Sequence, residues 1–100
     1  MSWATIYIAE LQAGKTLKFR PKGGSMTGKI NSGDLVTVCP RGDRMPQKGD
    51  VVLCKVNGQQ YLHLVKAEGP GRYLIGNNRG GTNGWTSLAN IFGFCISVEP

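Results

Sequence analysis

The sequence has 100 residues, which fits a single domain over residues 1–100 with one modest hydrophobic core. Its 15 glycines and five prolines favour a turn-rich β fold and argue against a helical bundle. The net charge of +6 suits a solvated basic surface, with nucleic-acid binding as the weaker alternative. No apolar run approaches the roughly 20 residues that cross a bilayer, so we expect no membrane anchor.

The three cysteines, Cys39, Cys54 and Cys95, are far apart and form no Cys-x-x-Cys pair. Together with one histidine they make a poor set of metal ligands. We therefore expect free, partly buried thiols, a cytoplasmic location, and neither a metal nor a cofactor.

The first segment, residues 2–13, carries apolar side chains at helical spacing. We expect a short helix there, with Ser2 as N-cap and Gly14 at its end. Residues 5–8 are rich in β-branched and aromatic side chains, so a strand is the alternative.

Beyond the first segment the apolar period changes to two. Residues 16–22 alternate basic or polar side chains with apolar ones, which predicts a half-buried strand with a basic outer face. A second strand is expected over residues 35–39, between the turn at residues 31–34 and Pro40.

The clearest local signal is a hairpin. Runs at residues 51–56 and 59–65 flank Asn57-Gly58, a dipeptide that favours a two-residue type I′ turn. That turn fixes the register and pairs Val52 with His63. Strands are also expected over residues 72–75 and 91–98, while residues 76–85 have no periodicity and predict a glycine-rich polar loop.

Two residues are candidates for nucleophilic catalysis, a serine and the histidine that could accept its proton. Ser25 follows Gly23 and Gly24, which allow a sharp turn and leave backbone N–H groups free to bind an oxyanion. His63 is the single histidine, and an imidazole can accept a serine proton near neutral pH. Each residue alone also has a plain structural interpretation, Ser25 as part of a turn and His63 as a core residue.

The order of several short motifs resembles one family over about residues 19–98, the LexA-like repressor peptidases and type I signal peptidases. The motifs are Gly24-Ser25-Met26, Gly33-Asp34 before a Val-rich strand, Gly49-Asp50-Val51-Val52, and His63 within a strand. The resemblance implies a mainly β, LexA/signal-peptidase-like compact antiparallel domain with one short N-terminal helix.

The resemblance also implies residue roles. Ser25 would be the nucleophile and His63 the general base, at a position where many family members have lysine. Lys66 is the fallback base, whereas Lys55 is expected to point away from the site. The backbone amides of Gly24 and Ser25 would form the oxyanion hole.

Two departures from the family pattern concern the site. Asn77 stands where family members often have an acidic residue, so it is the candidate third residue that orients His63. Gly23 replaces a serine that donates to the oxyanion in some signal peptidases. Met26 and Trp85 are candidates for the substrate cleft, with packing in the core as the alternative for both.

The implied function is a soluble serine endopeptidase that cuts a protein or peptide in trans through an acyl-enzyme on Ser25. By analogy the substrate would be a repressor or a stress or mobile-element regulator, lying extended along the edge of residues 16–22. Two alternatives remain: a catalytically inactive binding module with the same fold, and a small basic nucleic-acid-binding β-barrel. The oligomeric state is left open.

Overall fold

The structure, a computed structural model, describes residues 2–100. Over these residues seven strands form one antiparallel sheet in the order β1-β2-β7-β3-β4-β5-β6, with one α-helix packed against it. The elements are α1 Thr5–Gln12, β1 Leu17–Phe19, β2 Leu35–Pro40, β3 Val51–Val56, β4 Gln59–Gly69, β5 Arg72–Gly76, β6 Thr82–Ser87, the short 3₁₀ helix η1 Leu88–Asn90, and β7 Ile91–Glu99. The predicted mainly β fold with one short N-terminal helix is confirmed.

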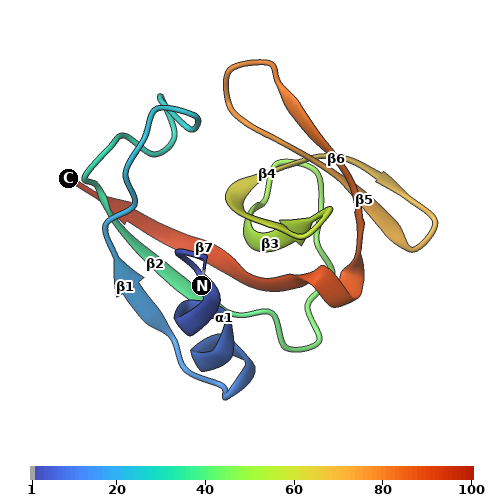
Figure 1. The fold of residues 1–100 in the computed structure, drawn as a ribbon, viewed down its shortest axis with the longest axis horizontal. Coiled ribbons are helices and arrows are strands. Elements are labelled where there is room, and N and C mark those ends of the chain that lie inside the picture. Colours follow the sequence, from blue (N-terminus) through green and yellow to red (C-terminus); the bar gives the residue numbers. More distant parts are fainter. Residues whose placement is uncertain (1) are drawn as a thin grey trace.

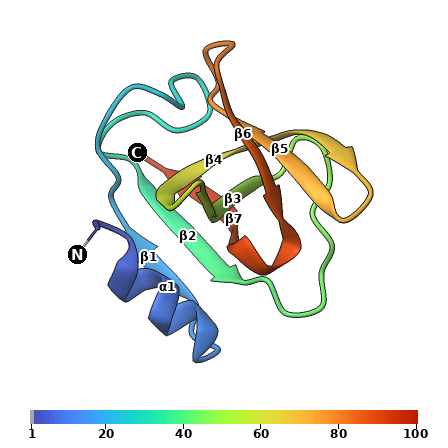
Figure 2. The same cartoon turned by 45° about the vertical axis from the view of Figure 1, so that its right-hand side comes forward.

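Strand β7 joins the two halves of the sheet. Its residues 93–99 pair with β2, while residues 91–94 pair with β3. Figures 1 and 2 show β1, β2 and α1 on one side of β7, and β3 to β6 curled over on the other side. Within residues 2–100 no helix is long and apolar enough to cross a membrane.

The β3–β4 hairpin has the predicted register. Val52 pairs with His63, and Val56 pairs with Gln59 next to the turn. Asn57 and Gly58 have φ angles of 50° and 81°, as both central residues of a type I′ turn require. Strand β4 continues beyond the predicted end to Gly69, because its second half pairs with β5.

Two apolar cores lie on opposite faces of β3, since successive side chains of a strand point to opposite sides. Leu53 belongs to the core beneath α1, whereas Val52 and Cys54 belong to the core inside the curl of β3 to β6. Strand β3 is therefore buried on both faces, and it holds the neighbouring strand β4 between the two cores.

Leu53→Ala is expected to lower the free energy of unfolding by about 3 kcal/mol, because it opens a cavity in a site that is 0% exposed. Denaturant unfolding measures the effect. The matched control is Ile96→Ala, which removes an aliphatic side chain that is 55% exposed and should change stability by less than about 0.5 kcal/mol. Equal losses in the two variants would contradict the assignment of Leu53 to the core.

The N-terminal helix begins later than predicted. Ala4, not Ser2, is the N-cap, and no side chain of the helix itself caps it. The side chain of Gln60 on β4 replaces the missing cap: it accepts from Ala4 N–H at 2.8 Å and donates to Thr5 Oγ1 at 3.0 Å. Gly14 ends the helix as predicted, with a φ of 87° that favours glycine.

Two further predicted boundaries were wrong. Only Leu17–Phe19 of the strand expected over residues 16–22 pairs in the sheet, since the following residues leave β2 towards Gly23. Residues 82–85, predicted as loop, belong to β6. This strand lacks apolar alternation and forms because β5 offers an unpaired edge, a tertiary effect that outweighs local propensity.

Candidate active site

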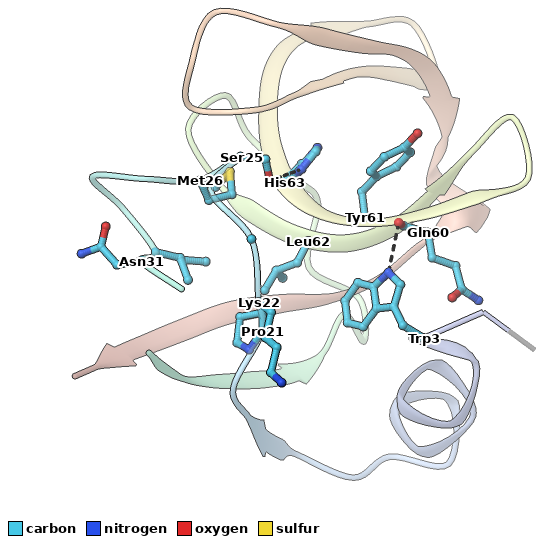
Figure 3. A pocket seen from close by; sticks show the side chains of 12 residues that line it. Trp3, Pro21, Lys22, Ser25, Met26, Asn31, Gln60, Tyr61, Leu62 and His63 are labelled. Carbon is cyan, nitrogen blue, oxygen red and sulfur yellow. Dashed lines mark hydrogen bonds between the residues drawn. The ribbon is translucent and has the colours of Figure 1, made fainter. Parts of the chain in front are cut away.

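Ser25 and His63, 38 residues apart in sequence, are hydrogen-bonded to each other. Ser25 lies in the loop between β1 and β2, and His63 lies on β4. The distance from Ser25 Oγ to His63 Nε2 is 3.0 Å, and Figure 3 shows the two side chains pointing towards each other. Such a distance is what proton transfer from a serine to an imidazole requires.

Two anchors hold the Ser25 loop over β4. Met26, only 5% exposed, is inserted into the core beneath α1. From the opposite side, the backbone N–H of Asn78 donates to the Ser25 carbonyl at 2.9 Å, and the Asn78 side-chain amide donates to the Thr27 carbonyl at 2.9 Å. The loop between β5 and β6 thus contributes to the position of Ser25.

His63 is held on three sides. It is 8% exposed, its ring stacks on Tyr61 at a centroid distance of 4.9 Å, and its Nδ1 lies 2.7 Å from Asn83 Oδ1. An amide oxygen only accepts hydrogen bonds, so Nδ1 carries the proton. Nε2 therefore presents its lone pair to Ser25, whose hydroxyl donates.

The residue that contacts His63 Nδ1 is Asn83, not the predicted Asn77. Asn77 Oδ1 is used within its own loop, where it accepts from the backbone N–H groups of Arg79 and Gly81, each at 2.8 Å. Asn83 is instead the extra residue of a β-bulge, because Gly84 pairs with Ile75 while Thr82 pairs with Gly76. Bulges re-aim side chains in this way, and the local sequence signal for this one is Gly84, whose φ of 130° favours glycine.

The surroundings of His63 favour its neutral form. Burial lowers the pKa of His63 below its ordinary value of about 6.5, while the hydrogen bond to Asn83 opposes part of this shift. The fallback base Lys66 is the extra residue of another bulge, between Val65 and Ala67, and its side chain lies against Gly76. Among the described residues His63 is the one titratable group hydrogen-bonded to Ser25.

The pKa of His63 is lower in the folded protein than in the unfolded chain. Below about pH 6.5 the unfolded chain therefore binds a proton at His63 more readily than the folded protein does. The contribution of His63 to stability is therefore present above about pH 6.5 and is lost as the pH falls through the lower folded pKa. We expect the free energy of unfolding to fall below pH 6.5 more steeply in the wild type than in His63→Gln. The sequence has a single histidine, so parallel curves for both proteins would contradict this origin.

Two of the three thiols, Cys54 and Cys95, are not candidate nucleophiles. Burial raises the pKa of Cys54 to about 12 and also raises the pKa of Cys95, so both remain protonated near neutral pH. All three cysteines are free. Among residues 2–100 no three His, Cys, Asp or Glu side chains are grouped as a metal site needs.

A pocket of about 330 Å³ opens beside Ser25 and His63. Its apolar part is formed by Met26, Ile30 and Leu62, which belong to the core beneath α1. Figure 3 shows Pro21 and Lys22 on one side of it, and Tyr61 and Trp3 on the other. The lining residues are Trp3, Pro21, Lys22, Gly23, Ser25, Met26, Ile30, Asn31, Gln60, Tyr61, Leu62 and His63.

Met26 lines this pocket, as predicted for a cleft residue. It also packs in the core, as its alternative interpretation predicted. Neither interpretation of Trp85 holds. It is 41% exposed, lies outside the pocket, and packs under the guanidinium of Arg72 at 4.5 Å. The reason is strand alternation on β6, which turns the neighbouring Thr86 inward and Trp85 outward.

The backbone amides of Gly24 and Ser25 remain available. Among the described residues, none of the hydrogen bonds in this loop uses either N–H group. Gly23, with a φ of 112°, makes the turn that brings the chain to Ser25. The amides next to the serine hydroxyl are thus free to bind a negatively charged oxygen.

Comparison with known proteins agrees with the resemblance seen in the sequence. The family model described as Peptidase S24-like matches residues 4–84, which include Ser25, His63 and Asn83. A search of the curated proteins finds no match. Because the match to the family model spans most of the chain, the chain belongs to the Peptidase S24-like family, within the LexA-like peptidase superfamily.

Proposed function

We propose that this protein is a serine endopeptidase that cleaves a protein substrate in trans through a Ser25–His63 dyad. The observation that carries the proposal is the 3.0 Å hydrogen bond from Ser25 Oγ to the unprotonated Nε2 of His63. A serine hydroxyl is a weak nucleophile unless a neighbouring base accepts its proton, and a neutral imidazole in this orientation meets that need.

The first step forms the acyl-enzyme. Ser25 Oγ attacks the carbonyl carbon of the scissile bond while its proton passes to His63 Nε2. The developing oxyanion accepts hydrogen bonds from the amides of Gly24 and Ser25. The imidazolium then donates the Nε2 proton to the leaving amine, and the bond to nitrogen breaks.

The second step releases the product. Water replaces the departed amine, His63 Nε2 accepts its proton, and the hydroxide formed attacks the acyl carbon. Collapse of the second tetrahedral intermediate returns the proton to Ser25 and frees a carboxylate. Asn83 is a positioning residue in both steps, because it holds the imidazole ring and fixes the proton on Nδ1.

An extended substrate fits between two chain segments. In the β3–β4 hairpin the backbone groups of Gln60 and Leu62 point away from β3, since they occupy the non-hydrogen-bonded pairs of the register. Strand β5 pairs with β4 only from Leu64 onward, so the edge at Leu62 is open to the pocket, while the Gln60 carbonyl accepts from Trp3 Nε1. Residues 21–23 form the facing wall, and a substrate strand inserted there would pair with Leu62.

The test compares new protein N-termini in a cell lysate treated with wild type, Ser25→Ala or His63→Ala. Cuts made by the wild type alone would support the dyad, and their sequences would report the substrate. Cuts that persist with Ser25→Ala would contradict the mechanism. If purified wild type also fails to cleave peptides from the lysate proteins, the inactive binding module is favoured instead.

A further inference from the structure

The pocket at Ser25 adjoins a second hollow at Trp3. This hollow measures about 360 Å³, and Trp3, Pro21 and Lys22 line both spaces. Trp3 is 50% exposed, yet it is held in place: its Nε1 donates to the Gln60 carbonyl at 3.4 Å, and its ring lies 6.0 Å from that of Phe19. The two hollows therefore adjoin at Trp3, and together they are called the groove.

The second hollow is positively charged. Residues 11–33 contain five cations and no acidic residue, and two of these cations, Arg20 and Lys22, line the hollow. Arg20 Nη1 donates to the Gly33 carbonyl at 2.7 Å, which orients the guanidinium, and within residues 2–100 its other N–H groups make no hydrogen bond. Among the described residues that line either space, none carries a carboxylate.

The groove has the reach of a short extended peptide. Trp3 contacts β4 at Gln60, three residues before His63, or about 10 Å along the strand at roughly 3.3 Å per residue. A substrate paired with this edge places its reacting carbonyl at Ser25. The substrate residue three to five positions from the scissile bond then lies beyond Trp3, next to Arg20 and Lys22.

We propose that the hollow lined by Trp3, Arg20 and Lys22 is a subsite for an acidic substrate residue three to five positions from the scissile bond. This inference rests on the proposed endopeptidase function and adds a substrate class to it. A peptide is favoured over a nucleic acid because the adjoining pocket at Ser25 borders the unpaired edge of β4 at Leu62. Of the three rings that line the hollow, Tyr7 and Phe19 stack on each other and Phe19 is buried, so the indole of Trp3 is the one well-exposed ring, too few for a series of stacked bases.

The experiment measures peptide binding without cleavage. In the variant Ser25→Ala/Trp85→Phe, Trp3 is the sole tryptophan, so its fluorescence reports occupation of the groove. The probes are four blocked alanine-rich dodecapeptides. Each carries a pair of glutamates or a pair of lysines about four residues from the central bond, either on its N-terminal side or on its C-terminal side. The glutamate peptides with one orientation should bind about fivefold or more tightly than their lysine counterparts, and salt at about 0.5 M should remove the difference.

Adding Lys22→Glu leaves Arg20 opposed by one carboxylate, so it should abolish the preference, whereas Lys48→Glu, an equal change of charge on an exposed loop outside the groove, should leave it intact. Equal binding of the glutamate and lysine peptides, or no saturable change in fluorescence, would overturn the subsite. If a 12-nucleotide single-stranded DNA binds more tightly than the glutamate peptides, and this binding also depends on Lys22, the acidic subsite is overturned in favour of a nucleic-acid surface. Cleavage by the wild type is scored separately, so a failed dyad and a failed subsite give different results.

Discussion

Ser25→Ala and His63→Ala are each expected to lower kcat by about 10³-fold or more, and the double variant by no more than the worse single variant. The reason is that the two side chains act as one unit across their 3.0 Å hydrogen bond. Without the imidazole the hydroxyl keeps its proton, and without the hydroxyl the imidazole has no nucleophile to activate. The measurement is kcat for a peptide taken from a cleavage site found in the lysate.

The matched control is Ser87→Ala, which removes the hydroxyl of an exposed serine on β6 and should leave kcat unchanged. Ser25→Ala should keep the unfolding transition of the wild type, because Ser25 lies on the surface. His63 is 8% exposed, so His63→Ala is expected to lose some stability, and kcat is compared under conditions in which denaturant unfolding shows each variant to be folded. Effects of Ser25→Ala and His63→Ala that multiply in the double variant would contradict a shared proton-transfer step.

The parts of the fold that the sequence predicted are those fixed by local chemistry. Asn57-Gly58 accepts the positive φ angles of a tight turn, and that turn alone set the register that places His63 opposite Val52. Gly14 ended the helix for the same reason. The meeting of Ser25 with His63 was expected from family resemblance, since nothing in a 38-residue separation requires contact.

The missed features depend on tertiary pairing. Strand β6 has no apolar alternation of its own, and Asn83 is aimed at His63 only because the pairing with β5 gains one extra residue there. The same pairing turned Trp85 outward, away from the cleft. Gln60, whose side chain caps α1 from another strand, likewise carries no signal in its neighbours along the chain.

Asn83→Leu is expected to lower kcat by roughly tenfold to 100-fold with little change in KM, because the imidazole loses the acceptor that fixes its orientation and its Nδ1 proton. Loss of this hydrogen bond also removes an interaction that raises the pKa of His63. The acid limb of kcat/KM, which follows protonation of this base in the free enzyme, should therefore move to lower pH.

Asn83→Asp should move the acid limb of the kcat/KM pH profile to higher pH. A carboxylate at this position still accepts from Nδ1, and its negative charge favours the imidazolium, so the pKa of His63 rises. The charge also stabilises the imidazolium formed during attack by Ser25, so kcat should be at least that of the wild type above the new pKa. Asn77→Asp is the control, because Asn77 keeps its two backbone donors and has no hydrogen bond to His63. Identical pH profiles for Asn83→Asp and the wild type would show that Asn83 fills space beside His63 without positioning it.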